Sequence, residues 1–229
     1  MSMQISAGEF KAGTTVKVYS ATVRLWHWVN ALCIVVLVIS GLLIAMPPPS
    51  VGGEASDHYI MGYIRFAHFT AGYVMAVAFL VRIYAAIVGN EHARSLFWVP
   101  FTDRQWRAGF VHQVRWYLFL EPASGRYVGH NPLAHVMMFL FLILMIFMIV
   151  TGFALYSEGA GEGSWQDTLF GWVIPLFGGS QALHSWHHLG MWAVVTFVIL
   201  HVYAAIREEI MSRQTMLGVI VSGTRTFRN

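Results

Sequence analysis

Histidine is the residue type in this chain that points most directly to chemistry. Eleven histidines are present, and seven of them lie within long apolar stretches. Four of these seven stand out by their depth and direction: His27, His68, His187 and His201. An ionisable side chain is costly inside a membrane-length apolar segment, so residues of this kind usually serve a function. Neutral imidazole is a common ligand of iron, copper and zinc. The four positions are therefore candidate metal ligands.

Depth and helical direction sort these four histidines into two pairs. His187 and His201 are fourteen residues apart. On a helix that turns ~100° per residue they point in directions only ~40° apart and are separated by ~21 Å along the axis. His68 lies near the same end of the expected spans as His187, and His27 lies near the end that holds His201. The spacing predicts two stacked sites, an outer one from His68 with His187 and an inner one from His27 with His201.

Paired imidazoles without a thiolate or carboxylate cluster favour the iron of a porphyrin. The only cysteine, Cys33, permits neither an internal disulfide nor a CxxCH attachment motif. We therefore predict two haems of the b type, bound without a covalent link. Gly41, Gly72, Gly152 and Gly190 would let a flat macrocycle approach the helices, although close helix packing is the favoured explanation for any one of them.

The remaining histidines are weaker candidates. His135, near the depth of His27, is the alternative inner ligand. His184 and His188 are expected at the membrane interface or in hydrogen bonds beside His187. Surface positions are expected for the histidines of the connecting segments, namely His58, His92 and His112.

Four apolar segments must position these residues, and each is long enough to cross the ~30 Å hydrocarbon core of a membrane. They cover residues 25–46, 63–88, 133–156 and 184–206. With 57% hydrophobic and 11% charged residues, the composition excludes a soluble fold, a disordered chain and a nucleic-acid-binding arm. The predicted fold class is an all-α integral membrane protein, a four-helix transmembrane bundle that binds haem between its helices.

Basic residues indicate the orientation of these spans. Twelve of the fourteen Lys and Arg residues lie in 1–24, 89–132 and 207–229, and none lies in 47–62 or 157–183. Because basic segments stay in the cytoplasm, we expect a multi-pass protein of the bacterial inner membrane with a cytoplasmic N-terminal segment and a cytoplasmic tail. The start has no cleavable signal peptide, so the first span should be retained.

Two connecting stretches are apolar enough to lie along the membrane surface. Residues 98–120 are rich in Trp and Arg and are predicted as an interfacial helix on the cytoplasmic side. Residues 165–177 form a similar apolar run on the outer side. An aromatic belt at the lipid headgroups explains most of the nine tryptophans.

A weak internal repeat relates the second and fourth spans. From His68 and His187 onward they read HFTAGYVMAVAFLVRIYAAI and HHLGMWAVVTFVILHVYAAI, with Arg82 in the place of His201. The inner site therefore needs its second ligand from elsewhere, and His27 is at that depth. Arg65, one turn before His68, is predicted to pair with a haem propionate, with Arg82 as its inner counterpart. Snorkelling to the headgroups is the alternative for Arg65.

Several longer motifs closely resemble the b-type cytochrome subunit of membrane-bound nickel-iron hydrogenases. They are RLWHW from Arg24, MGYIRFAHFTAG from Met61, RWYLFL from Arg115, GHNPLA from Gly129, TGFALYSE from Thr151, HSWHHLGMW from His184 and HVYAAIREEIM from His201. The resemblance extends from about Val18 to Val221. It implies an anchor in membrane lipid that takes electrons from the small subunit of a periplasmic hydrogenase dimer and gives them to quinone. It assigns the haem ligands to the same four histidines, and it gives His188 no role.

This resemblance makes the chain an electron-transfer subunit, because a lone cysteine cannot supply a hydrogen-cleaving nickel-iron site. That chemistry belongs to the hydrogenase's own subunits. For quinone, the inner-end depth and the resemblance point to His130 and Asn131. The HNP motif is also a helix-start signal, with Asn131 as N-cap and Pro132 at the first position.

Two other functions remain open from the sequence. One is a dihaem anchor of another periplasmic oxidoreductase, such as formate dehydrogenase. The other is a haem-free transporter or metal carrier that uses the histidines. Transporters usually have broken helices with polar residues at the membrane midplane, whereas these spans are polar mainly at their ends.

Overall fold

The computed structural model describes residues 15–49, 54, 58–89, 94–125, 127, 130–212 and 215–226. The predicted cytoplasmic segment 1–24 is thus described only from residue 15 onward. Residues 213, 214 and 227–229 of the predicted tail, like His92, lie outside the described residues.

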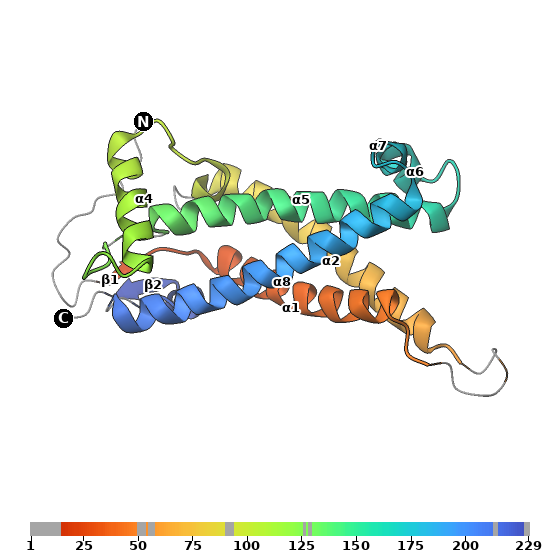
Figure 1. Ribbon diagram of the computed structural model, residues 1–229, viewed down its shortest axis with the longest axis horizontal. Coiled ribbons are helices and arrows are strands. Elements are labelled where there is room, and N and C mark those ends of the chain that lie inside the picture. Colours follow the sequence, from red (N-terminus) through yellow and green to blue (C-terminus); the bar gives the residue numbers. More distant parts are fainter. Residues whose placement is uncertain are drawn as a thin grey trace. The chain divides into compact units, whose positions relative to one another are not determined.

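Four long helices carry most of the chain (Figure 1). They are α1 (Ala21–Ala45), α2 (Ile60–Val88), α5 (Pro132–Ala160) and α8 (Ser180–Met211). Each has an apolar stretch long enough to cross a membrane, and each coincides with one predicted span. At ~1.5 Å per residue the shortest, α1, is about 38 Å long. Large apolar side chains such as Leu32, Leu80 and Ile199 are exposed along them, as expected for surfaces that face lipid.

Local sequence explains where these helices begin and end. The helix α1 ends before Pro47, because proline disfavours helical backbone in the residue that precedes it. The Oδ1 atom of Asn131 accepts a hydrogen bond of 2.8 Å from the backbone N–H of Ala134, so Asn131 is the N-cap of α5, as predicted. The helix α8 continues beyond the predicted limit at residue 206, because Arg207 and Glu208 are buried there.

Shorter elements connect the long helices. They are the 3₁₀-helix η2 (Ser95–Phe97), α4 (Arg104–Tyr117), α6 (Trp165–Phe170), α7 (Val173–Leu176), α9 (Val219–Ser222), β1 (Thr15–Lys17) and β2 (Thr224–Thr226). The helix α4 occupies the middle of the stretch predicted as interfacial. It starts at Asp103, whose carboxylate accepts from the backbone N–H groups of Gln105 and Trp106. It buries Trp106, Gln113 and Trp116 and exposes Arg104.

The contacts of the chain divide it into two units. The first unit consists of Met1–His27, Arg82–Ile143 and Phe197–Asn229, and the second of Trp28–Val81 and Leu144–Thr196. Each of the four long helices contributes one part of its length to each unit. The two units are described separately below.

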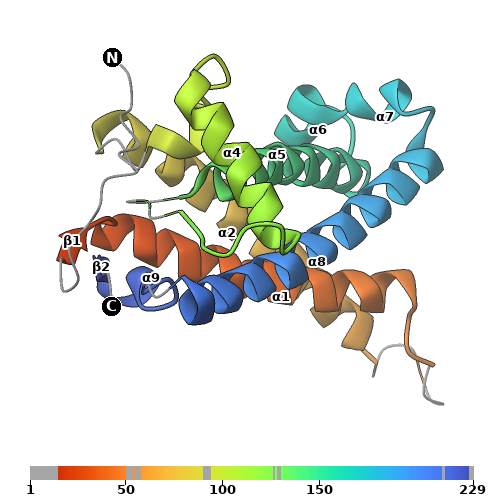
Figure 2. The same ribbon diagram turned by 60° about the vertical axis from the view of Figure 1, so that its left-hand side comes forward.

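The first unit contains a small strand pair that the sequence analysis did not predict. The strands β1 and β2 pair antiparallel, with Val16 opposite Arg225. Next to them a small core joins Val18, Tyr19, Val23 and Val219. Figure 2 shows β1, β2 and α9 beside the first turns of α1. The N-terminal and C-terminal segments of the described chain are thus tied together in this unit.

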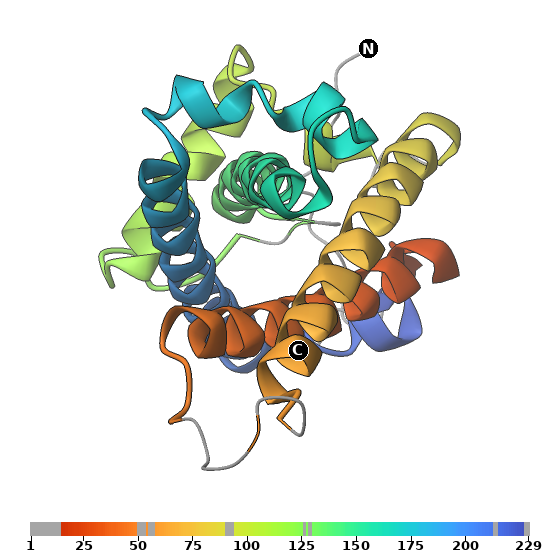
Figure 3. The ribbon, with the colours of Figure 1, turned by 90° about the vertical axis from the view of Figure 1, so that its right-hand side faces the viewer.

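The second unit is organised around the short helices α6 and α7. A core of Ala154, Val173 and Leu183 packs α7 against α5 and α8. Figure 3 shows α6 and α7 beside the ends of these two helices. The side-chain amide of Gln166 in α6 donates a hydrogen bond of 2.8 Å to the hydroxyl of Tyr73 in α2. The apolar run predicted over residues 165–177 therefore forms two short helices that pack onto the long ones.

Candidate functional site

A cavity of about 940 Å³ lies within the second unit. Residues from all four long helices line it, and both His68 and His187 are among them. Cavities that bind cofactors typically measure ~300–1,000 Å³ and are mostly apolar. Apart from the histidines and a few polar side chains, this cavity is lined by apolar residues such as Leu37, Met75 and Ile149. Its size and lining suit a large, flat, mainly apolar cofactor.

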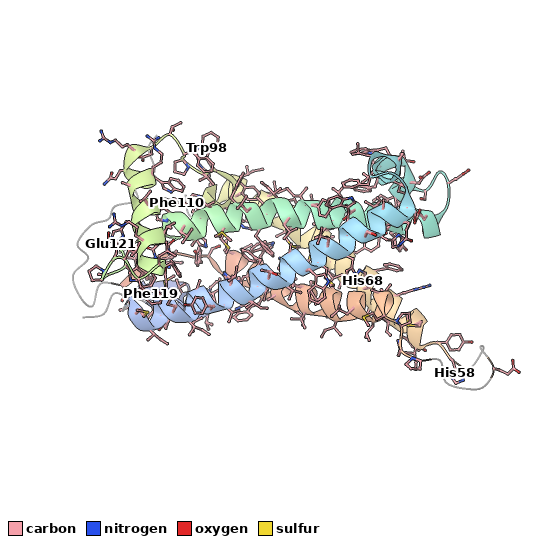
Figure 4. All side chains as sticks on the ribbon, viewed as in Figure 1. His58, His68, Trp98, Phe110, Phe119 and Glu121 are labelled. Carbon is pink, nitrogen blue, oxygen red and sulfur yellow. The ribbon has the colours of Figure 1, made fainter. Side chains whose placement is uncertain are left out.

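The ring of His68 is held by the neighbouring helix α1. Its Nδ1 atom lies 2.9 Å from the hydroxyl oxygen of Ser40, and that hydroxyl donates to the backbone carbonyl of Val36 at 2.6 Å. Since the serine proton is already used, the imidazole Nδ1–H is the donor to Ser40. The other ring nitrogen, Nε2, then carries a lone pair and can act as a metal ligand. Figure 4 labels His68 among the side chains of the long helices.

The ring of His187 is held in the same way by α5. Its Nδ1 atom lies 2.7 Å from the hydroxyl oxygen of Thr151, which donates to the carbonyl of Phe147 at 2.7 Å. A glycine follows the hydroxyl residue in both places. A Cβ atom added at Gly152 would lie 3.3 Å from Cε1 of His187, and one at Gly41 would lie 3.4 Å from Cε1 of His68. Both glycines thus leave space beside a histidine ring.

The other two glycines singled out from the sequence differ from this pair. A Cβ atom at Gly190 would lie 2.5 Å from the sulfur of Met148 and 2.9 Å from the ring of Phe147. Close helix packing therefore explains Gly190, as favoured above. Gly72 lines the cavity and has no side chain near the place of a Cβ atom.

Arg65, His184 and His188 also line the cavity, together with the polar residues Gln181 and Ser185. The two histidines make hydrogen bonds within their own helix. Nδ1 of His184 lies 3.0 Å from the carbonyl of Ser180, and Nε2 of His188 accepts from the indole N–H of Trp192 at 3.1 Å. Arg65 is the only arginine of the cavity lining. It places a positive charge where the carboxylates of a cofactor could be neutralised.

The donor set fits a haem better than a metal ion bound by protein alone. Among the described residues there is no group of three or more His, Cys, Asp and Glu side chains placed to hold a metal. Protein-bound zinc takes three or four protein ligands. Two imidazoles suffice where a macrocycle supplies the other four ligands of the iron.

The first unit brings together the other predicted pair. The ring centres of His27 and His201 are 6.4 Å apart, with an angle of 47° between the rings. An imidazole nitrogen binds a first-row metal at about 2.0–2.1 Å, so two rings with centres this far apart leave room for one metal ion between them. The observed spacing therefore fits one iron between them. His201 also stacks on Phe197, with ring centres 5.7 Å apart.

Arg82, the predicted inner counterpart of Arg65, lies in this same unit. Only 3% of the residue is exposed. Its guanidinium carbon lies 5.4 Å from the ring centre of Trp26 and 5.3 Å from that of Phe97. A cation over aromatic faces is stabilised in this way away from water.

His135, the alternative inner ligand, has another partner. Its Nε2 atom makes a short hydrogen bond to the backbone carbonyl of Ser95, and its ring packs edge-on against Trp106. The Nε2 atom of His135 is thus bonded to Ser95, whereas the ring centre of His27 lies 6.4 Å from that of His201. The geometry therefore favours His27 over His135.

The two residues considered for quinone have different surroundings. The ring of His130 is half-buried, with Nδ1 3.4 Å from the hydroxyl of Tyr19. The side-chain amide of Asn131 donates a short hydrogen bond to the buried carboxylate of Glu208. Gln113 also donates to Glu208, at 2.9 Å, and this network links α4, α5 and α8. Asn131 is therefore both a helix cap and part of a buried polar network.

Sequence reasoning missed Glu208 and the two hydroxyl residues. Glu208 lies beyond residue 206, the end of the fourth predicted span, and falls in the predicted cytoplasmic tail. Ser40 and Thr151 had a readable signal: ISG at residues 39–41 and VTG at 150–152 share a β-branched residue, a hydroxyl and a glycine. The repeat that relates α2 to α8 thus has a counterpart in α1 and α5.

Burial shifts the pKa of ionisable groups near the strand pair of the first unit. Burial raises the pKa of Tyr19, and the positive charges of Arg225 and Arg82 oppose this shift. Burial also raises the pKa of Tyr127, with a further contribution from the negative charge of Glu208. Burial lowers the pKa of Arg225, which donates to the backbone carbonyl of Tyr127 at 2.6 Å. The two tyrosines therefore keep their protons at neutral pH.

This chain is similar to several known proteins. A family model described as prokaryotic cytochrome b561 matches residues 18–223. A relative from Azotobacter chroococcum mcd 1 is 58% identical over 94% of this chain and 90% of its own length. A relative from Cupriavidus necator is 56% identical over 97% of this chain and 93% of its own length. A relative from Escherichia coli K12 is 46% identical over 92% of this chain and 91% of its own length. The first two are named probable Ni/Fe-hydrogenase B-type cytochrome subunit, and the third probable Ni/Fe-hydrogenase 1 B-type cytochrome subunit.

Proposed function

Because this chain belongs to the prokaryotic cytochrome b561 family, we propose that it is a dihaem cytochrome b that anchors a periplasmic nickel-iron hydrogenase and passes its electrons to quinone. Membership confirms the resemblance inferred from the motifs. It also makes the chain a hydrogenase-associated b-type cytochrome subunit with an all-α, multi-pass membrane fold. The finer claims below are proposals.

The haem ligands are the first of these claims. The observation that carries the proposal is the second-unit cavity, where two imidazoles are each fixed through Nδ1 and each keep Nε2 for a metal. His68 and His187 would hold one haem b there, and His27 and His201 would hold another in the first unit. When bound, haem b supplies one-electron redox chemistry at its iron. The apolar walls of the cavity exclude water from the ligand nitrogens.

The two arginines would neutralise haem propionates. Arg65 lines the second-unit cavity, and Arg82 is buried in the first unit with the other histidine pair. A carboxylate that leaves water is stabilised when a charged guanidinium donates to it. Arg65 would thus orient the outer haem and Arg82 the inner one.

Charge and the names of the relatives support the proposed partner and orientation. The names of the relatives connect them to Ni/Fe hydrogenase, which favours this enzyme over formate dehydrogenase as the partner. Residues 157–183 carry Glu158, Glu162 and Asp167 but no Lys or Arg, which supports a periplasmic position for this segment. We place both termini in the cytoplasm and the histidine pair of the second unit nearer the small subunit of the hydrogenase.

The quinone would be reduced near the first-unit pair. Its carbonyl oxygens need hydrogen-bond donors, and the imidazole of His130 together with the hydroxyl of Tyr19 provides such donors. Asn131 would stabilise the structure around the quinone site and not bind quinone itself, because its side chain already bonds to Glu208 and to the backbone at the start of α5.

Haem content and electron transfer test the proposal directly. The pyridine haemochrome spectrum of the purified protein should give two haems b per chain. His187→Ala should lose one haem and stop reduction of the cytochrome by the hydrogenase. His201→Ala should also lose one haem, but it should keep reduction of the other haem and lose quinone reduction.

The neighbouring His184 supplies the matched control. It lies on the same helix and lines the same cavity, but around the helix it points ~100° away from His201, against ~40° for His187, so His184→Ala should retain both haems. One haem per chain in the wild-type protein, or quinone reduction that survives in His201→Ala, would contradict the assignment.

A further inference from the structure

The two ligand candidates of the second-unit cavity, His68 and His187, are each bonded to one hydroxyl group of an adjacent long helix. Ser40 in α1 contacts His68 in α2, and Thr151 in α5 contacts His187 in α8, with O–N distances of 2.9 and 2.7 Å. In both pairs the hydroxyl residue is followed by a glycine next to the imidazole. The same small arrangement thus occurs twice, once on each of two helix pairs.

The hydrogen bonds assign the direction of donation. Each hydroxyl has a single proton, and it lies in line with the carbonyl four residues earlier, that of Val36 for Ser40 and that of Phe147 for Thr151. The oxygen can then only accept from the imidazole. The proton of each neutral ring must be on Nδ1, and Nε2 is left with its lone pair.

We propose that Ser40 and Thr151 are positioning residues of the outer haem site, which select the Nε2-ligating form of His68 and His187 and tune the potential of the iron. This inference rests on the proposed ligation by those two histidines. A hydroxyl that accepts from Nδ1–H fixes the rotation of the ring and makes the imidazole a stronger donor to iron. A stronger donor favours ferric over ferrous iron, so both hydroxyls lower the reduction potential.

The two hydroxyls are not equivalent. The backbone carbonyl of Leu37 also interacts with the ring of His68, so it can partly replace the Ser40 hydroxyl as an acceptor. Thr151 is the hydroxyl bonded to Nδ1 of His187. We therefore expect Thr151→Val to have the larger effect and Ser40→Ala the smaller one.

Redox titration of the purified, haem-loaded protein tests this inference. The titration should resolve two components. Thr151→Val should shift one component to a higher potential, leave the other unchanged, and lower haem affinity at that site about 10–100-fold. The low-spin ferric EPR signal of the same haem should change, because it depends on the orientation of the two imidazole planes. Thr151→Ser keeps the hydroxyl and should restore both readouts.

A threonine on α8 provides the matched control. The hydroxyl of Thr196 donates to the carbonyl of Trp192, also four residues earlier, at 2.9 Å. Thr196→Val therefore removes the same kind of intrahelical bond and should change neither potential. If Thr151→Val and Ser40→Ala both behaved like Thr196→Val, the inference would be overturned. A wild-type protein without a two-histidine low-spin signal would instead overturn the haem proposal and this inference with it.

Discussion

The guanidinium carbon of Arg207 lies 4.4 Å from the ring centre of Phe119, a residue whose backbone has a φ of 62°. The same guanidinium donates to the carbonyls of Trp116 and Tyr117 at 3.0 and 3.1 Å. These carbonyls belong to the last turn of α4, where backbone acceptors have no partner within the helix. A side chain from α8 thus satisfies the end of α4 and packs on a residue in the left-handed region. Figure 4 labels Phe119 beside the end of α8.

Replacing Arg207 should therefore destabilise the first unit. Arg207→Ala removes two charge-assisted hydrogen bonds and the stacking on aromatic rings, at a cost of about 2–4 kcal/mol in the free energy of unfolding. Thermal unfolding in detergent would measure this as a lower transition temperature. Arg104→Ala is the control, because Arg104 is exposed in the first turn of α4, where a positive charge is unfavourable. An equal loss in both variants would show that the contacts of Arg207 contribute nothing specific.

The raised pKa of Tyr19 predicts a loss of stability in alkali. The ordinary pKa of tyrosine is 10.0, and burial raises it in the folded chain. The folded state therefore holds the phenol proton more tightly than the unfolded state. This contribution is complete below pH 10 and decreases as the pH rises through the folded pKa, by at most about 1.4 kcal/mol per pH unit.

Tyr19→Phe isolates this effect. It should flatten the decrease of thermal stability above pH 10, and it should lower stability at neutral pH by about 0.5–1.5 kcal/mol because the hydrogen bond to His130 is lost. Tyr59→Phe, at a site 60% exposed, is the matched control and should keep the wild-type slope. The explanation fails if Tyr19→Phe and the wild type lose stability in parallel above pH 10.

Some of this architecture was predictable and some was not, for physical reasons. A membrane span is encoded by about twenty consecutive apolar residues, so all four long helices were found. The histidine pairs were predictable because depth and helical direction follow from residue number alone. The strand pair was not, because three-residue strands such as Thr15–Lys17 carry no periodic pattern, and the partner strand Thr224–Thr226 is over two hundred residues away.

The hydrogen-bonding partners of the ligand candidates depend on how each helix is rotated about its own axis relative to its neighbours. The apolar pattern that predicts a span does not give this rotation. In the sequence, Ser40 taken alone does not differ from any other small residue of a transmembrane helix. Only the structure shows that its hydroxyl oxygen lies 2.9 Å from Nδ1 of His68. The predicted fourth span ends at residue 206, because the charged residues that follow, Glu208 among them, interrupt the apolar pattern. The helix α8 nevertheless continues to Met211. The burial of Glu208 depends on donors from Gln113 and Asn131, which lie far away in sequence.

Glycine substitutions should distinguish space for a cofactor from ordinary helix packing. Gly152→Ala would place a methyl group 3.3 Å from Cε1 of His187 and should lower the haem content of the purified protein towards one haem per chain. Gly62→Ala in α2 is the control, since nothing lies within 4 Å of its Cβ position and Gly62 does not line the cavity. That variant should retain both haems and gain about 0.5–1 kcal/mol in stability, because alanine favours helix over glycine. Full haem content in Gly152→Ala would show that the ring of His187 can move aside.

Arg65 offers the sharpest electrostatic test of the outer site. It lines the cavity with His68, three residues and nearly one helical turn away. If its guanidinium neutralises a propionate, its positive charge also stabilises the electron added to the iron. Arg65→Gln should then lower the potential of the outer haem by an amount on the order of tens of millivolts. Arg65→Lys keeps the charge but not the bidentate geometry and should give a smaller shift. The measurement is a redox titration of each variant with haem content checked beside it. An unchanged potential in Arg65→Gln, with both haems retained, would make Arg65 a membrane anchor that snorkels to the headgroups and does not contact the cofactor.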